Sequence, residues 1–367
     1  MRERFFVPDT YFMSHSVGCL PRLTEARIEQ DYLTPWRIGT NWSDWMTILD
    51  RFRAHIGERL GVDAATICPQ TNISSALTKI LHSLSDEVRR KDPSRKVILL
   101  TRQDFPTIGF VVAQAERAGY EMRFIDGDVT NPAVWADSIT DDVAFVHVTH
   151  ALSNSSHVLP VQAICDRARQ AGALSIVDVA QSVIAVPTPV NDWQADFVTG
   201  TSVKFLCGGP GACFLYVAPE RLADCRPVDV GWFSHDNPFE MDITRFRYAD
   251  NAMRFFGGTP SPAPFICANA ALSLWASLDL QAIHARIQDH LDRLSASVPD
   301  DELVSPKDRN QRGATCVVNP HDRDALSARL DAASIRYDVR DSGFRFSVHG
   351  YTSDADISRL TECLRDL

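Results

Sequence analysis

The feature that most constrains this chain is a regular alternation, between residues 64 and 217, of short apolar runs with segments of helical period. The runs are apolar at successive positions, as strands are when helices cover both faces of their sheet. They lie at Val97–Thr101, Val143–Thr149, Leu174–Asp178, Asp196–Gly200 and Ala212–Val217. The helical segments lie at Ile73–Leu84, Thr107–Ala118 and Val161–Gln170. This order predicts an α/β fold with a mainly parallel sheet and helices on both of its faces.

The pattern changes after the proline-rich stretch Pro260–Pro264. A single long helix is predicted next, over Phe265–Ala296, and a smaller α+β unit follows it. Its strands are predicted at Ala314–Asn319, Ile335–Val339 and Phe344–Val348, and its helices at Asp322–Ala333 and Asp354–Leu364. At roughly 100–200 residues per domain, the length allows more than one domain. We therefore expect an N-terminal segment and large domain over residues 1–258, and a small C-terminal domain over residues 259–367.

Composition excludes several kinds of partner. The net charge of -10 and the pI near 5.5 argue against a nucleic-acid binder and against docking on an anionic membrane. No apolar run approaches the ~20 residues of a membrane span, and the first residues lack a signal-peptide core. The nine cysteines form no Cys-x-x-Cys pair, and the histidines show no metal-binding spacing on a helix. We expect a cytoplasmic protein with reduced thiols and no metal.

The sharpest local signal is the segment Thr201–Gly211, with the sequence TSVKFLCGGPG. Its Lys204 is flanked by hydroxyl groups, apolar residues and a glycine cluster. A partly desolvated lysine amine has a lowered pKa and can form a Schiff base with an aldehyde. The glycines let the backbone pass close to a bulky ligand. The alternative is a lysine at a strand end whose amine reaches into solvent.

A second signal precedes this lysine by 26 residues, where the apolar run Leu174–Asp178 ends in a carboxylate. Ligands of open α/β sheets bind beyond the carboxyl ends of the strands. A carboxylate there keeps a pyridine nitrogen protonated, so that the ring can accept electrons from a carbanion. Alternatively, Asp178 caps the helix that follows. Together with Lys204, it predicts pyridoxal 5′-phosphate (PLP) as cofactor and an amino acid as substrate.

Further landmarks lie in order along nearly the whole chain. They are Tyr11–Arg22 (YFMSHSVGCLPR), Trp42–Trp45 (WSDW), Gln70–Ser74 (QTNIS), Phe105–Thr107 (FPT), Gly231–Phe233 (GWF), Arg254–Pro260 (RFFGGTP), and Arg345 with Gly350–Thr352 (GYT). In this order they resemble the class V aminotransferase superfamily of fold-type I PLP enzymes, and within it most closely the kynureninases. The resemblance implies the fold-type I PLP-dependent transferase fold.

The resemblance also implies a cofactor site. Lys204 is expected to form the aldimine with the cofactor and to move protons, Asp178 to pair with the pyridine nitrogen, and Phe105 to stack on the ring. The residues expected to contact the phosphate are Thr71, Asn72, Gln181 and Ser202. Ser155 is expected to lie beside the cofactor. Thr71 and Ser202 could instead cap helices, and Phe105 could be an ordinary core aromatic residue.

Three more residues follow from the same resemblance. Trp232 and Thr259 are expected to reach the phosphate of a neighbouring subunit, which implies a homodimer with shared active sites. Arg345 is expected to hold the substrate carboxylate through two parallel hydrogen bonds. Trp232 could alternatively be a core aromatic residue, and Arg345 could pair with a structural acid.

The chain departs from the kynureninase pattern at three positions. Val203 replaces the tyrosine before the lysine, Gln181 replaces a histidine, and Ile108 replaces the acid after Phe-Pro-Thr. The reactive cysteine loop of cysteine desulfurases is also absent between Tyr337 and Arg345.

These departures leave several reactions open. We expect a lyase or hydrolase that cleaves at the β or γ carbon of an L-amino acid. The alternatives are an aminotransferase, an amino-acid epimerase and a carbon–sulfur lyase of the same group. A non-enzymatic protein of this fold is disfavoured, because the chain has both Lys204 and Asp178.

Overall fold

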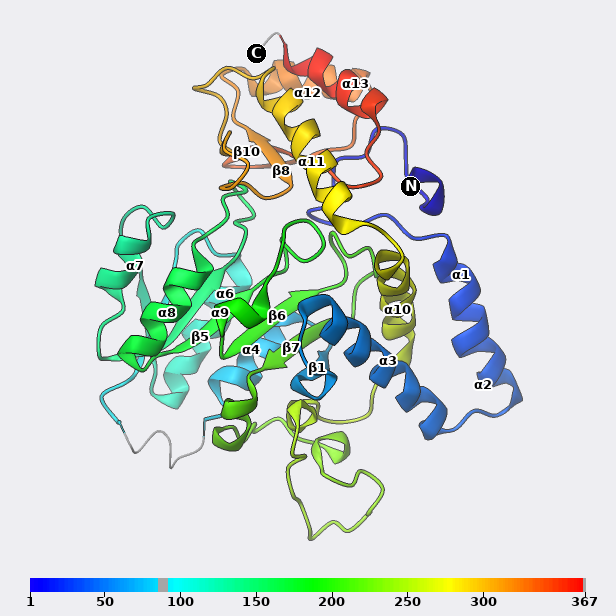
Figure 1. Cartoon of the computed structure of the whole chain (residues 1–367), viewed down its shortest axis with the longest axis vertical. Helices are drawn as coiled ribbons and strands as arrows, with labels where there is room; N and C mark the ends of the chain where they lie inside the picture. Colours follow the sequence, from blue (N-terminus) through cyan, green and yellow to red (C-terminus); the bar gives the residue numbers. More distant parts are fainter. Residues whose placement is uncertain (85–91, 366–367) are drawn as a thin grey trace.

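The computed structural model describes residues 1–84 and 92–365, and its main body is a seven-stranded sheet (Figure 1). The strand order is β1-β7-β6-β5-β4-β2-β3, and the run from β6 to β3 is parallel. The strands are β1 (Ile67–Gln70), β2 (Val97–Leu100), β3 (Glu121–Phe124), β4 (Val143–Thr149), β5 (Leu174–Asp178), β6 (Phe197–Thr201) and β7 (Cys213–Val217). β7 runs in the direction opposite to that of the other strands of this sheet. The predicted α/β class is therefore confirmed.

The two faces of this sheet bury two separate hydrophobic clusters. Along β2, Val97 and Leu99 belong to one cluster, whereas Ile98 and Leu100 belong to the other. Because successive side chains of a strand point to opposite faces, a strand between two cores must be apolar at every position. The first cluster is covered by α3 (Trp42–Leu60), α8 (Val161–Ala171), α9 (Val190–Trp193) and α10 (Pro262–Ala276), and the second by α4 (Ile73–Leu81) and α6 (Pro106–Gln114).

A smaller body holds the C-terminal part of the chain, drawn in yellow, orange and red in Figure 1. Its antiparallel sheet has the order β8-β10-β9 and a hydrophobic cluster of its own. Its elements are α11 (Leu280–Ser295), β8 (Thr315–Val318), α12 (Arg323–Ala332), β9 (Asp338–Arg340), β10 (Gly343–Ser347) and α13 (Asp354–Leu364). The division of the chain into domains at 258/259 stays a prediction.

The single long helix predicted over Phe265–Ala296 is wrong. The chain forms α10 and α11, which meet at 90° across the break Ser277–Asp279. Asp279 causes the second start, because its side chain accepts a hydrogen bond from the Ala282 N–H at 3.1 Å and caps α11. Among the described residues, no single helix is both long and apolar enough to cross a membrane.

The N-terminal segment connects the two bodies. It includes the helices α1 (Leu23–Ile28) and α2 (Thr34–Ile38), drawn in blue in Figure 1. Before them, the Phe12 N–H donates to the Arg336 carbonyl of the small body, and the Gly18 N–H donates to the Val203 carbonyl beside β6. Residues near 12–18 therefore lie where the small body meets the carboxyl ends of the large sheet.

Candidate active site

Lys204 lies in the loop that leaves the carboxyl end of β6. This loop is held by the N-terminal segment, which passes so closely that a Cβ on Gly18 would lie 2.1 Å from the Lys204 carbonyl oxygen. The amine lies 5.6 Å from the centroid of the Phe105 ring. Burial lowers the pKa of Lys204; the carboxylate of Asp178 opposes this shift, whereas nearby guanidinium groups add to it. A lowered amine pKa suits Schiff-base chemistry.

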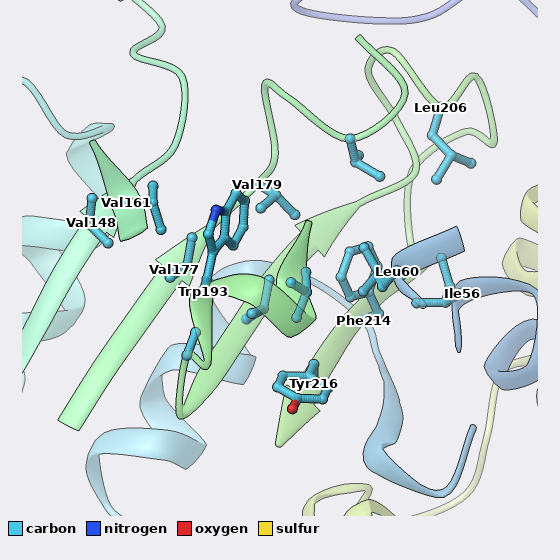
Figure 2. Close-up of a cluster of buried hydrophobic side chains, with 14 of the residues drawn as sticks. Ile56, Leu60, Val148, Val161, Val177, Val179, Trp193, Leu206, Phe214 and Tyr216 are labelled. Carbon is cyan, nitrogen blue, oxygen red and sulfur yellow. The ribbon is translucent and has the colours of Figure 1, made fainter. Parts of the chain in front are cut away.

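Asp178 ends β5, one strand away from the lysine loop. Its neighbours Val177 and Val179 pack in the hydrophobic cluster of Figure 2, together with Trp193 and Phe214. Since strand neighbours alternate, the Asp178 side chain points away from that cluster. It is 4% exposed, and one carboxylate oxygen accepts from the Ala180 N–H at 2.7 Å. A turn follows Asp178, and the next helix, α9, begins only at Val190, so the carboxylate does not cap a helix.

A buried network behind Asp178 was not predicted from the sequence. Asp104 accepts hydrogen bonds from the Thr149 hydroxyl at 2.6 Å and the Thr101 N–H at 2.9 Å. The Nδ1 atom of His147 lies 3.4 Å from the same carboxylate. Burial acts to lower the pKa of His147, but the carboxylates of Asp104 and Asp178 outweigh it, and the net shift is upward. The sequence feature that could have indicated this network is His147, a histidine inside the apolar run of β4.

Phe105 directly follows Asp104 and is the N-cap residue of α6. Its side chain is 41% exposed. The amine of Lys204 and the guanidinium of Arg340 both lie over this ring, at 5.6 and 5.5 Å from its centroid. An exposed aromatic face beside a partly buried amine can stack on a planar ligand.

Thr71 and Asn72 lie at the start of α4, and both are exposed. Asn72 caps this helix by accepting from the Ser75 N–H at 2.8 Å, and its amide donates to the Thr71 hydroxyl at 3.3 Å. A capped, exposed helix start offers backbone N–H groups to an anion. This is a suitable place for a phosphate.

Three other predicted cofactor residues contact protein groups. The Gln181 amide donates to the His15 carbonyl at 3.1 Å. The Ser202 hydroxyl lies 2.7 Å from the carbonyl oxygens of both Gly209 and Ala212. The Ser155 hydroxyl accepts from a backbone N–H two residues later, at 3.4 Å. Their roles toward the cofactor stay predictions.

Arg345 is 1% exposed and lies on β10. One guanidinium nitrogen donates to the Ser153 carbonyl at 3.0 Å, and another pairs with Asp338. The same Asp338 carboxylate contacts Nε2 of His15 at 3.2 Å. Arg345 therefore does pair with an acidic residue of the protein, Asp338, which was the alternative to its binding a substrate carboxylate. In this pair the side chain of Asp338 is 23% exposed, whereas that of Arg345 is 1% exposed.

Trp232 and Thr259 lie together, away from these groups. The indole N–H donates to the Thr259 hydroxyl at 3.3 Å, and the indole ring packs on Trp42 at 5.5 Å. The segment around them exposes several large apolar side chains, namely Val228, Val230, Phe239, Met241, Ile243 and Phe246.

These groups fit PLP. The protein offers a partly buried amine for the aldehyde of PLP, an exposed aromatic ring for its pyridine, a buried carboxylate for its ring nitrogen and a helix start for its phosphate. All four groups lie at the carboxyl edge of one sheet. Lys204, Asp178, Phe105 and the pair Thr71–Asn72 would hold the corresponding parts of the cofactor. The cofactor supplies a sink for negative charge on the substrate.

Comparisons with known proteins identify the family of this chain. Residues 38–360 match the model of the family described as Aminotransferase class-V. A kynureninase of Burkholderia pseudomallei is 29% identical over 388 residues, covering 100% of this chain and 91% of the relative. A kynureninase of Deinococcus radiodurans is 30% identical over 91% of this chain and 84% of the relative.

Two solved structures share the fold. A cysteine desulfurase from Thermococcus onnurineus NA1 has a TM-score of 0.84 at 18% identity, covering 97% of this chain and 94% of the other. The cystine C-S lyase C-DES, in complex with cysteine persulfide, has a TM-score of 0.84 at 22% identity and covers 97% of each chain.

Proposed function

Because this chain belongs to the Aminotransferase class-V family and is a PLP-dependent enzyme, we propose that it uses Lys204 and Asp178 to cleave the side chain of an amino acid. Its reaction is that of a lyase or hydrolase, with cleavage at the β or γ carbon. The observation that carries the residue roles is the Lys204 amine, 5.6 Å from the exposed Phe105 ring, with the buried carboxylate of Asp178 nearby. Aminotransferase, epimerase and carbon–sulfur lyase chemistry are the alternatives.

Each of the site residues is proposed to have its own role in the reaction. Asp178 would hold a proton on the pyridine nitrogen, and Phe105 would fix the plane of the ring. Arg345 would bind the α-carboxylate of the substrate, which would displace Asp338 from the guanidinium. The Lys204 amine would accept and return protons at the carbon beside the substrate nitrogen.

His15 is the proposed second proton carrier. Burial lowers its pKa to about 4, so the imidazole is neutral at pH 7. Its Nε2 faces Asp338, which orients the ring, and its backbone carbonyl is held by Gln181. His235 is a less suitable proton carrier, because it is bonded to Glu240 in the exposed segment.

The proposal includes a homodimer in the cytoplasm. Trp232 and Thr259 would complete the phosphate site of the other subunit, and each subunit would do the same for its partner. The exposed apolar side chains around Trp232 suit such a contact. Nine free cysteines, eight of them buried, suit a reducing compartment.

The test is chemical trapping of the cofactor. Borohydride reduction of the holoenzyme should fix the pyridoxyl group on Lys204, as located by peptide mapping. Lys79 is the internal control, because it is also buried but donates to the carbonyl groups of Phe255 and Phe256 at 2.9 and 2.7 Å. Labelling of Lys79 or of another lysine would contradict the proposal. Product analysis with amino acids then separates cleavage from transamination and epimerisation.

A further inference from the structure

The strands β9 and β10 place three charged side chains on one face of a hairpin. Arg345 lies directly opposite Asp338 in the antiparallel register, so the two side chains share a face. Arg340 follows Asp338 by two residues on β9 and therefore points the same way. Val339, between them, points outward and is 42% exposed.

This face of the hairpin meets the cofactor side of the large domain. The Ser153 carbonyl accepts from Arg345 at 3.0 Å, and the Asn154 side chain accepts from Arg340 at 3.1 Å. Successive residues of one loop thus hold the two guanidinium groups. The Arg340 guanidinium also lies 5.5 Å from the centroid of the Phe105 ring, over which the Lys204 amine lies as well.

The two arginines differ in their partners. Arg345 is paired with Asp338, whose carboxylate also contacts His15. Arg340 has only the neutral Asn154 at its guanidinium, and no carboxylate among residues 1–84 and 92–365 lies within 4.0 Å of it. Its positive charge contributes to the lowered pKa of Lys204, so it acts on the catalytic amine electrostatically.

We propose that Arg340 binds an anionic group at the end of the substrate side chain, so that the enzyme acts on acidic amino acids. The substrate class is an L-amino acid that carries a side-chain carboxylate, sulfinate or sulfonate. This inference rests on the proposed function, because it takes Arg345 as the site of the α-carboxylate and Lys204 as the reacting amine.

Charge balance favours this class over neutral or cationic side chains. Lys204 has the carboxylate of Asp178 as its charge partner, so the two guanidinium groups of Arg340 and Arg345 are left with the one carboxylate of Asp338. The α-carboxylate of any amino acid satisfies Arg345 and leaves Arg340 without an anion. A second anion on the substrate completes the pairing, whereas a lysine-like side chain adds a like charge close to Arg340.

The position of Arg340 is fixed rather than adaptable. The Arg323 guanidinium donates to the Arg340 carbonyl at 2.5 Å, which holds the end of β9. Asn154 and the Phe105 ring hold the Arg340 side chain from two sides. A planar guanidinium held in this way selects a planar or tetrahedral oxyanion by geometry as well as by charge.

The test is binding by the holoenzyme, followed through the cofactor absorbance and by calorimetry. The probes are L-aspartate, L-glutamate and L-cysteine sulfinate, with L-asparagine and L-glutamine as neutral counterparts. We expect at least one acidic probe to bind about tenfold more tightly than its neutral counterpart, since one charge-assisted hydrogen bond contributes roughly 1.5–3 kcal/mol. Arg340→Gln should remove this preference, so that the ratio of the affinities for the acidic and the neutral probe falls to about one.

Two further variants control the result. Arg336→Gln removes a positive charge from an exposed arginine four residues earlier and should keep the preference. Arg340→Lys keeps the charge and should restore part of it. Equal binding of acidic and neutral probes by the wild type overturns the role of Arg340 and leaves the proposed function intact. No response to any of the probes also overturns the role of Arg340, whereas the proposed function fails only if trapping does not place the cofactor on Lys204.

Discussion

Asp178→Asn is the substitution whose effect follows most directly from the structure. The carboxylate is 4% exposed, and burial raises its pKa while His147 and Lys204 favour the charged form. An amide has the same shape and can still accept from the Ala180 N–H, so the fold should persist. What is lost is the negative charge beside the protonated ring nitrogen of the cofactor.

The size of the loss can be worked from Coulomb's law. Two unit charges about 4 Å apart, at the effective dielectric constant of about 20 that suits protein sites, attract with about 4 kcal/mol. One factor of ten in rate corresponds to about 1.4 kcal/mol. If the whole attraction is used in stabilising the carbanion, kcat/KM should fall roughly a thousandfold.

The assay compares kcat/KM for Asp178→Asn with that of a matched control. Asp196→Asn removes another buried carboxylate, at 8% exposure, which bonds Ser175 at the opposite end of β5. This control should lose stability in thermal unfolding but keep its turnover per folded molecule. A rate for Asp178→Asn within tenfold of the wild type, with the cofactor bound, would refute the electrostatic role of Asp178.

Two further predictions concern assembly and substrate. The enzyme should sediment as a homodimer, and Trp232→Ala should weaken cofactor retention, since the indole is proposed to serve the other subunit; an active wild-type monomer would exclude this arrangement. The enzyme should also release little anthranilate from L-kynurenine while still showing a cofactor absorbance change, because Val203 has no hydroxyl to donate and Ile108 has no acid; fast anthranilate release by the wild type would contradict this.

The central strands were predictable because both of their faces are buried. Every position of β4 and β5 except Leu174 is buried, and this yields an unbroken apolar run that is visible in the sequence. The outer strands were missed. The edge strand β3 is half exposed, and β1 has only four residues, one of them a proline. Neither has the apolar run that identifies a central strand.

Helix boundaries failed where the apolar pattern continues through a bend. The sequence through Ser277–Asp279 keeps a helical rhythm, but α10 packs on α3 whereas α11 packs in the small body. Tertiary contacts, together with the cap at Asp279, decide the break.

The candidate site divides into a predictable and an unpredictable half. Lys204 and Asp178 follow buried strands, and the carboxyl edge of a parallel sheet brings such residues together. His15, Asp338 and Arg340 come from the N-terminal segment and the small body, and only the folded chain brings them to the same place. No local pattern marks them.

The departures from the kynureninase pattern acquire a common physical meaning in the fold. The Val203 carbonyl accepts from the Gly18 N–H at 2.8 Å, and the Gln181 amide donates to the His15 carbonyl at 3.1 Å. Two of the three departures therefore contact the same N-terminal segment, one at His15 itself and the other at Gly18, a few residues later. The third, Ile108, is 1% exposed in the core and cannot act on a ligand. The proposed replacement for these acid–base groups is therefore His15, the titratable side chain of this segment that contacts Asp338.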